Sequence, residues 1–260
     1  MNDTEHIISH FNIAGSVAEV KPLGNGLIND TFKVTTHGDA PDYVLQRINN
    51  SIFTDVDLLQ HNIDAVTAHI RRKLEAEGAV DIDRKVLQFV VSDTGKSYWQ
   101  DSDGSYWRMS VFIPRAFTHE TVNPEYSYYA GKAFGNFEAM LADMSEELGE
   151  SIPDFHNMEL RRRQLHDALK EDRAGRAAGV KDFVAQLEQY ADEMCRAQQL
   201  HREGRLPKRI CHCDTKVNNM LFDEEGHVLC VIDLDTVMPS LFYSDYGDFL
   251  RSAANTVAED

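Results

Sequence analysis

The most informative segment of the chain, residues 209–235, reads Arg209-Ile-Cys-His-Cys-Asp-Thr-Lys-Val-Asn-Asn-Met-Leu-Phe-Asp-Glu-Glu-Gly-His-Val-Leu-Cys-Val-Ile-Asp-Leu-Asp235. Two apolar runs in it, 220–222 and 228–232, have the length and composition of buried strands. The polar residues 223–226 between them end in a glycine and are typical of a turn. We therefore expect the two runs to pair as a β-hairpin.

Three oxygen-bearing side chains flank this hairpin: Asp214 and Asn219 before it and Asp233 directly after it. Phosphoryl transfer from a nucleotide needs such a set. One carboxylate must accept the proton of the acceptor hydroxyl, while an amide oxygen and a second carboxylate hold the Mg²⁺ that bridges the phosphates. We assign the first role to Asp214 and the metal to Asn219 and Asp233. Asp and Asn also favour plain turns, but three of them in register between apolar strands favour the catalytic interpretation.

Composition limits the classes of function. The chain has 260 residues, with 26 Lys and Arg against 43 Asp and Glu, for a formal net charge of -17. This length allows one bilobal unit or two small domains. The charge disfavours nucleic acid and anionic membranes as partners. Because the amino terminus is polar and the apolar runs are short, we expect no signal peptide, no membrane span and a cytoplasmic location.

The cysteines suggest packing more than chemistry. Cys211 and Cys213 flank a histidine, with Cys195 and Cys230 elsewhere. A Cys-x-Cys spacing differs from the Cys pairs of zinc sites, and adjacent residues of an extended chain point to opposite faces. We expect all four to be small buried residues.

A second informative region lies near the amino terminus. Residues 17–23 and 30–36 have strand patterns and enclose a loop with Gly24 and Gly26. Glycines allow main-chain N–H groups to approach phosphates closely, so these two are candidate nucleotide-binding residues. The same pattern also occurs in ordinary hairpins.

The remaining pattern separates strands from helices. We expect a short helix ending at Phe11, a long helix from Thr54 or Asp55 to just before Gly78, and strands at 43–48, 85–91, 96–100 and 105–113. Pro114 ends the last strand, and a hinge there would offer main-chain groups of Val111 to Ile113 to an adenine. Helical patterns follow at 124–143, 158–172, 180–200 and 244–251. This order predicts an α+β, two-lobed protein, with a nucleotide-binding lobe at 1–113 and a helical catalytic lobe at 114–260.

Four segments resemble the N-acetylhexosamine 1-kinase branch of the aminoglycoside phosphotransferase superfamily, and the similarity spans nearly the whole chain. They are Tyr-Val-Leu-Gln-Arg-Ile-Asn at 43–49, Ile-Pro-Asp-Phe-His-Asn at 152–157, His-Cys-Asp-Thr-Lys-Val-Asn-Asn at 212–219 and Ile-Asp-Leu-Asp-Thr-Val-Met-Pro at 232–239. The third resembles the kinase catalytic loop, although Cys213 stands where protein kinases have arginine. The resemblance implies a bilobal protein-kinase-like fold and ATP- and Mg²⁺-dependent phosphorylation of the anomeric hydroxyl of N-acetylglucosamine or N-acetylgalactosamine.

The resemblance also implies roles for other residues. In this superfamily the third strand carries a lysine that contacts phosphates; Arg47 is the matching cation, with Lys33 as a rival and a solvent-facing Arg47 as the plain alternative. His212, Asp235 and Asp248 match positions that support the catalytic loop. Similar proteins continue past the helix of Asp248, so we expect the helical lobe to lack its last helices.

Other functions stay open at this stage. The same scaffold phosphorylates choline, homoserine and aminoglycosides. A hexosamine would need neutral hydrogen-bonding groups in the acceptor site, whereas a cationic acceptor would need an acidic pocket. A non-catalytic pseudokinase is a further alternative, which the presence of Asp214, Asn219 and Asp233 disfavours.

Overall fold

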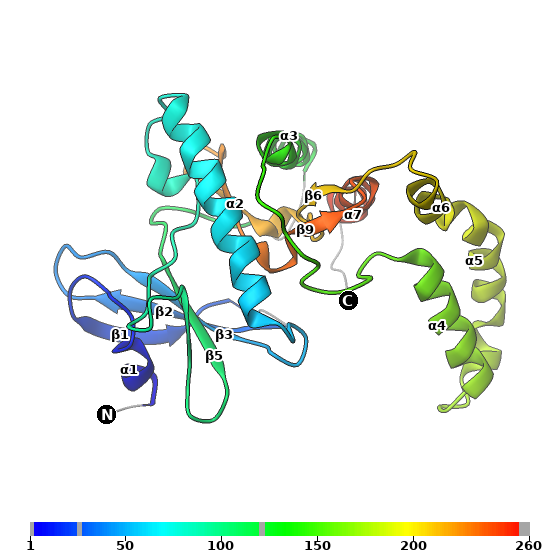
Figure 1. Ribbon diagram of the computed structural model, residues 1–260, viewed down its shortest axis with the longest axis horizontal. Coiled ribbons are helices and arrows are strands. Elements are labelled where there is room, and N and C mark those ends of the chain that lie inside the picture. The colour runs from blue at the N-terminus through cyan, green and yellow to red at the C-terminus, as the bar shows by residue number, and fades with distance from the viewer. Residues whose placement is uncertain (1–2, 25–27, 120–122, 255–260) are drawn as a thin grey trace.

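The computed structural model describes residues 3–24, 28–119 and 123–254. Its amino-terminal part is a five-stranded antiparallel sheet with the strand order β1-β2-β3-β5-β4 (Figure 1). The strands are β1 (Val17–Pro22), β2 (Asp30–Thr36), β3 (Tyr43–Ile48), β4 (Tyr98–Gln100) and β5 (Tyr106–Val111). Alternating side chains bury one face against α1 (Asp3–Ile8), where Ile7 and Ile8 pack with Leu45 and Met109.

Helix α2 (Val56–Ala76) connects the sheet to the rest of the protein. The Asp55 side chain caps it by accepting a hydrogen bond from the Leu58 N–H at 2.9 Å. Its apolar stripe, predicted from the three-to-four spacing, is buried in one core cluster with Ile48 of the sheet. The same cluster contains Phe137 of α3 (Pro124–Leu141) and Leu234, so α2 forms the common wall of both lobes.

The catalytic stretch lies in the second lobe. The predicted hairpin is present as β7 (Met220–Phe222) paired with β8 (Val228–Val231). Before and after it run β6 (Arg209–Cys211) and β9 (Met238–Ser240), which pair with each other. Helix α7 (Tyr243–Ala253) follows and packs beside the loop that connects β6 to β7. The predicted bilobal α+β class is confirmed.

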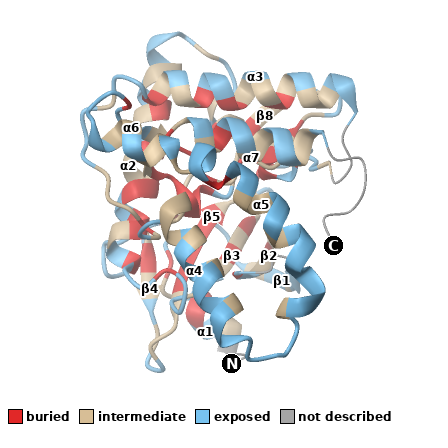
Figure 2. Cartoon of the chain, turned by 90° about the vertical axis from the view of Figure 1, so that its right-hand side faces the viewer, coloured by how far each residue is buried: buried red, intermediate tan, exposed pale blue. Residues whose placement is uncertain are grey.

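Three helices form an arm that projects from this lobe: α4 (Met158–Glu171), α5 (Lys181–Met194) and α6 (Arg196–Arg202) (Figure 1). Figure 2 shows that α4 and α5 are mostly exposed, whereas the strands of the sheet carry many buried residues. Ala191 is the one buried residue in the three helices. The arm is thus held with little apolar burial.

Two expectations about local structure need correction, and one strand pair was not expected. Residues 85–91 form no regular strand, because β4 already covers the first half of that edge of β5; only the bridge between Phe89 and Ser110 remains. The helix expected at 180–200 is divided at Cys195 into α5 and α6. The β6–β9 pair was not predicted, since its partners are far apart in the sequence. In the described ranges no helix is long and apolar enough to cross a membrane.

Candidate functional site

Asp214 lies in the loop between β6 and β7, and its neighbours orient its carboxylate. The Asn219 amide donates hydrogen bonds to the Asp214 main-chain oxygen and to Asp214 Oδ2, both at 2.9 Å. The Lys216 ammonium lies 3.1 Å from the same Oδ2. Within the described residues, Oδ1 receives no hydrogen bond, so one oxygen is held in place and the other can accept a proton.

Asp233 comes two residues after the end of β8. Its left-handed backbone (φ 58°) turns the chain into the short 3-10 helix Leu234–Thr236. The Ile232 N–H donates to the Asn219 carbonyl at 2.9 Å, which ties this turn to the Asp214 loop. The pKa of Asp233 is raised to about 6. The main cause is desolvation by the surrounding protein, and the negative charges of Asp235 and Asp214 add to it. Negative charge is therefore concentrated at this point.

The donor set suits a magnesium ion. Asn219 uses its side-chain NH₂ group on Asp214, and its side-chain oxygen Oδ1 accepts no hydrogen bond from the described residues. The Asp233 carboxylate likewise has no hydrogen-bond donor in the described ranges. An amide oxygen and a carboxylate that are both unused are hard ligands of the kind that Mg²⁺ prefers. A divalent cation here would also relieve the repulsion among the acidic groups.

His212 supports the loop from inside the protein. Its side chain is fully buried, with Nε2 2.9 Å from the Ile232 carbonyl and its ring edge-on to Phe134. Its main-chain carbonyl accepts a hydrogen bond from Thr236 Oγ1 at 2.7 Å. The histidine thus connects the loop of Asp214 to both ends of the turn that carries Asp233.

Asp245 on α7 is a site residue that the sequence interpretation missed. Its carboxylate accepts hydrogen bonds from the main-chain N–H groups of His212 and Cys213, at 2.7 and 2.9 Å. The second bond holds Cys213 in a left-handed conformation (φ 65°) directly before Asp214. The sequence contained one clue to this role, because Asp245 is a second aspartate that stands three residues before Asp248.

Asp248, one helical turn further along α7, accepts a hydrogen bond from the Thr215 N–H at 2.7 Å. Two consecutive turns of one helix therefore contact main-chain amides on both sides of Asp214.

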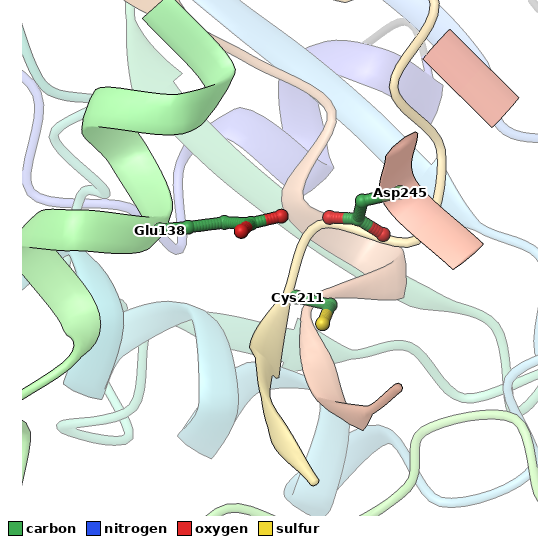
Figure 3. Close-up of side chains that lie close together, drawn as sticks. All are labelled: Glu138, Cys211 and Asp245. Atoms are coloured by element: carbon green, nitrogen blue, oxygen red, sulfur yellow. The ribbon is translucent and has the colours of Figure 1, made fainter. Parts of the chain in front are cut away.

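Figure 3 shows the Glu138 carboxylate of α3 pointing toward Asp245, with the Cys211 thiol below them. Ligand atoms of these three residues lie within 4.8 Å of one another, as metal ligands would. Both oxygens of Asp245 are already used by main-chain amides, so we interpret the cluster as support for the loop. Burial, opposed by His212, raises the pKa of Asp245 to about 7, and burial also raises the pKa of Glu138.

The Arg47 side chain does not lie with the candidate site residues. Its side chain is 51% exposed and pairs with Asp30 at 3.5 Å. Strand alternation directs its neighbour Gln46 to the opposite face, where Gln46 Oε1 accepts a hydrogen bond from Arg108 Nε at 3.0 Å. Lys33 shares the face of Gln46, because it pairs with Val44 in the register of β2 and β3.

The other proposed nucleotide contacts lie at the ends of strands. Gly24 follows β1 with φ 71°, and a Cβ there would meet nothing within 4 Å. Gly26 lies outside the described residues. The Val111 N–H already donates to the Gln88 carbonyl at 2.9 Å, whereas the main chain of Ile113 forms no hydrogen bond with the described residues. Ile113 therefore has main-chain groups available at the hinge.

The bilobal fold and the grouping of Asp214, Asn219 and Asp233 place the chain in the class of protein-kinase-like folds. Similar solved structures support this fold class. Spectinomycin phosphotransferase APH(9)-Ia, in complex with ADP and spectinomycin, is 11% identical with a TM-score of 0.59, covering 98% of this chain and 80% of that chain. Choline kinase LicA from Streptococcus pneumoniae is 16% identical with a TM-score of 0.50, over 93% and 71%.

A third similar structure is a thermostable mutant of aminoglycoside phosphotransferase APH(4)-Ia in a ternary complex with ADP and hygromycin B. It is 15% identical with a TM-score of 0.51, covering 95% of this chain and 76% of that chain. A model of the phosphotransferase enzyme family matches residues 19–259, so the chain belongs to this family. It is a kinase-like phosphotransferase of small molecules, with an alcohol group as the acceptor.

Proposed function

We propose that the protein is an ATP- and Mg²⁺-dependent kinase that transfers the γ-phosphoryl group to the anomeric hydroxyl of an N-acetylhexosamine. The grouping of Asp214, Asn219 and Asp233 supports nucleotide and metal use, because it supplies one oriented base and two unused hard ligands. Bound ADP in the similar spectinomycin and hygromycin phosphotransferase structures also supports a nucleotide donor. The sugar assignment depends on the four sequence segments and on the acceptor side of the site.

Asp214 performs the proton transfer in this proposal. The acceptor hydroxyl oxygen attacks the γ-phosphorus, the bond from that phosphorus to the bridging oxygen of ADP breaks, and the hydroxyl proton passes to Asp214 Oδ1. Oδ1 is the suitable atom because Oδ2 is already engaged by Asn219 and Lys216. Asp214 thereby orients the acceptor and removes its proton as the new bond forms.

Asn219 and Asp233 would hold the metal, which supplies positive charge that neutralises the phosphate oxygens when it is bound. Lys216 adds a cation next to Asp214, 3.1 Å from the Oδ2 atom that Asn219 also contacts. From this position the ammonium can bind an oxygen of the transferred phosphoryl group. The sequence interpretation looked for the phosphate-binding cation on the third strand and missed Lys216, two residues after Asp214.

The environment of His156 favours a neutral acceptor. It lies in the segment 152–157, whose Phe155 packs against Cys211 and Cys213 of the catalytic stretch. Burial lowers the pKa of His156, and the carboxylates of Asp248 and Asp214 are close enough to oppose this effect. Its Nδ1 is buried and has no hydrogen-bond partner in the described part of the chain. A neutral imidazole with an unused nitrogen suits a sugar hydroxyl or acetamide better than a quaternary ammonium.

The test is acceptor-dependent ADP release with a panel of N-acetylglucosamine, N-acetylgalactosamine, choline, homoserine, spectinomycin and hygromycin B. We expect turnover with the N-acetylhexosamines and a sugar 1-phosphate as the product, identified by phosphorus NMR. The methyl glycoside of N-acetylglucosamine is the matched control, because it differs only in its blocked anomeric oxygen. Turnover of the methyl glycoside would exclude the anomeric position.

A preference for another member of the panel would overturn the sugar assignment and leave the phosphotransferase class intact. Choline turnover would show that a cationic acceptor is preferred in spite of the neutral imidazole. No ADP release with any acceptor, together with intact binding of Mg-ADP, would favour the pseudokinase.

A further inference from the structure

Asp235 is the point at which separate segments of the chain meet. Its side chain is buried, two residues after Asp233. Asp235 Oδ1 forms an ion pair with Arg108 Nη1 of β5 at 2.5 Å, and Oδ2 accepts a hydrogen bond from Asn29 Nδ2 at 2.6 Å. Its main-chain carbonyl accepts a hydrogen bond from Ser151 Oγ at 2.9 Å. One residue of the helical lobe thus contacts the sheet and the end of the glycine-containing loop.

Both partners of Asp235 are themselves held by the sheet lobe. Asn29 Oδ1 accepts a hydrogen bond from the Asn49 N–H at 2.9 Å, directly after β3. Arg108 Nε donates to Gln46 Oε1 at 3.0 Å. Because each partner bonds on two sides, a shift of the sheet lobe at Asn29 or Arg108 is transmitted to Asp235 and not absorbed by a free side chain.

The position of Asp235 makes this contact relevant to the metal ligand. Asp233 and Asp235 are separated by Leu234, which is buried in the core cluster of α2. Asp233 has a left-handed backbone, so the direction of its carboxylate depends on how the following short helix is anchored. Arg108 and Asp235 are both nearly inaccessible, at 3% and 4% side-chain exposure, which makes their pairing insensitive to solvent screening.

A role in stability alone explains this arrangement poorly. A buried ion pair often contributes no more than apolar residues of the same volume would, because both charges lose their hydration. A buried ion pair does, however, fix the position of the two segments that carry its charges relative to each other. Here those segments are the strand next to the hinge and the turn that carries Asp233.

We infer that Asp235 is a positioning residue that couples the placement of the sheet lobe, through Asn29 and Arg108, to the direction of Asp233, so that nucleotide and divalent cation strengthen each other's binding through it. This inference rests on the proposed nucleotide and metal roles. In this inference, Asn29 and Arg108 act through Asp235 and do not themselves touch the substrate. Loosening either partner weakens the coupling between the two ligands more than it weakens ADP binding itself.

The experiment measures the affinity for ADP by calorimetry with saturating Mg²⁺ and with EDTA, and takes the ratio of the two dissociation constants as the coupling. In Asn29→Ala we expect this ratio to fall by about tenfold, with ADP affinity in EDTA unchanged. Arg108→Met should behave in the same way, and Arg108→Lys should recover part of the coupling because it keeps the charge but loses the donor to Gln46.

Asn50→Ala is the matched control, because Asn50 is an exposed asparagine close in sequence that bonds only the Gly104 carbonyl in the described structure. It should leave the ratio unchanged. If Asn29→Ala lowers the melting temperature while the ratio stays at the wild-type value, Asp235 is a structural residue only and the inference is overturned. Should Asn29→Ala fail to fold, Asp235→Asn decides by the same criterion, since it preserves the shape of the side chain.

The outcomes separate this inference from the proposed function. A wild type whose ADP binding does not respond to Mg²⁺ overturns both. A wild type with coupling that depends on Asn29, but without turnover of any N-acetylhexosamine, overturns the sugar assignment alone. Normal sugar turnover with coupling independent of Asn29 and Arg108 overturns the inference alone.

Discussion

The loop that carries Asp214 and the helical arm of α4, α5 and α6 belong to the same lobe but are stabilised differently. Around the loop, the buried side chains of His212, Asp235 and Asp245 each bond to main-chain groups or to other buried polar side chains. In the arm, exposed ion pairs such as Arg202 with Glu159, at 2.7 Å, connect helices with almost no buried residues. Removing one partner from a buried network leaves a group unpaired in the interior, whereas water replaces a lost surface partner.

This contrast predicts a steep gradient of mutational effects from the loop to the arm. The largest is expected for Asp214→Asn, which removes the proton acceptor and leaves the shape of the side chain. Turnover should fall by about a thousandfold or more, with ADP affinity nearly unchanged, because Asp214 acts on the acceptor. Asp103→Asn, in an exposed turn of the sheet lobe, is the control. Severe loss of ADP binding in Asp214→Asn would show that Asp214 contributes to the nucleotide site instead.

Asp233→Asn should weaken the binding of Mg-ADP, whereas Asp214→Asn should lower turnover. Loss of the charged ligand is expected to weaken Mg²⁺-dependent ADP binding about a hundredfold, and ADP binding in EDTA should be nearly unchanged. Calorimetric titrations of both variants provide the comparison. The metal role of Asp233 fails if this variant binds Mg-ADP as tightly as the wild type.

Steady-state kinetics can rank two of the three cationic candidates for the phosphates, Lys216 and Arg47. Lys216→Ala should lower kcat/KM by about ten- to a hundredfold, because it removes the ammonium next to Asp214. Arg47→Ala should change the KM for ATP by less than about twofold, because its side chain faces solvent on the opposite side of β3. A large increase of the KM for ATP in Arg47→Ala would restore the phosphate contact that the resemblance implied.

A smaller effect is expected on the pH dependence of stability. The pKa of Asp245 in the folded protein is about 7, above its ordinary value of 3.8, and that of Glu138 is also raised. Between these values the folded state binds more protons than the unfolded state, so the free energy of unfolding falls as pH rises, by at most about 1.4 kcal/mol per pH unit and proton.

Glu138→Gln should make this decline shallower, because it removes one of the two facing carboxyl groups (Figure 3). Urea unfolding at a series of pH values between about 4 and 7 measures the slope. Glu125→Gln, an exposed position at the start of the same helix, is the control. An unchanged slope in Glu138→Gln would show that the pair does not govern this dependence.

The smallest effect is expected in the arm. Arg202→Ala removes the exposed pair with Glu159 and should lower the melting temperature by less than about 2 °C, without changing turnover. Differential scanning calorimetry checks it. A larger shift would mean that the arm is bound to the rest of the lobe more tightly than its exposure suggests, and the contrast drawn above would be too strong.

The sequence alone was sufficient for features with local causes. The hairpin of β7 and β8 follows from two short apolar runs around a glycine turn, and it brings Asn219 close to Asp233 wherever the rest of the chain lies. The α2 helix follows in the same way from its stripe and its Asp55 cap. The succession of strands and then helices was enough to predict the α+β class.

Tertiary structure decided which side chains face the site. Arg47 and Gln46 are adjacent on one strand, and only the packing of the sheet on the helical lobe selects the face of Gln46, since neighbouring residues of a strand point to opposite sides. The contacts of Asp245 with the His212 amide and of Asp235 with Arg108 and Asn29 join segments far apart in the chain. No local pattern specifies such partners, because a buried carboxylate can be satisfied by any donor that the fold brings within reach.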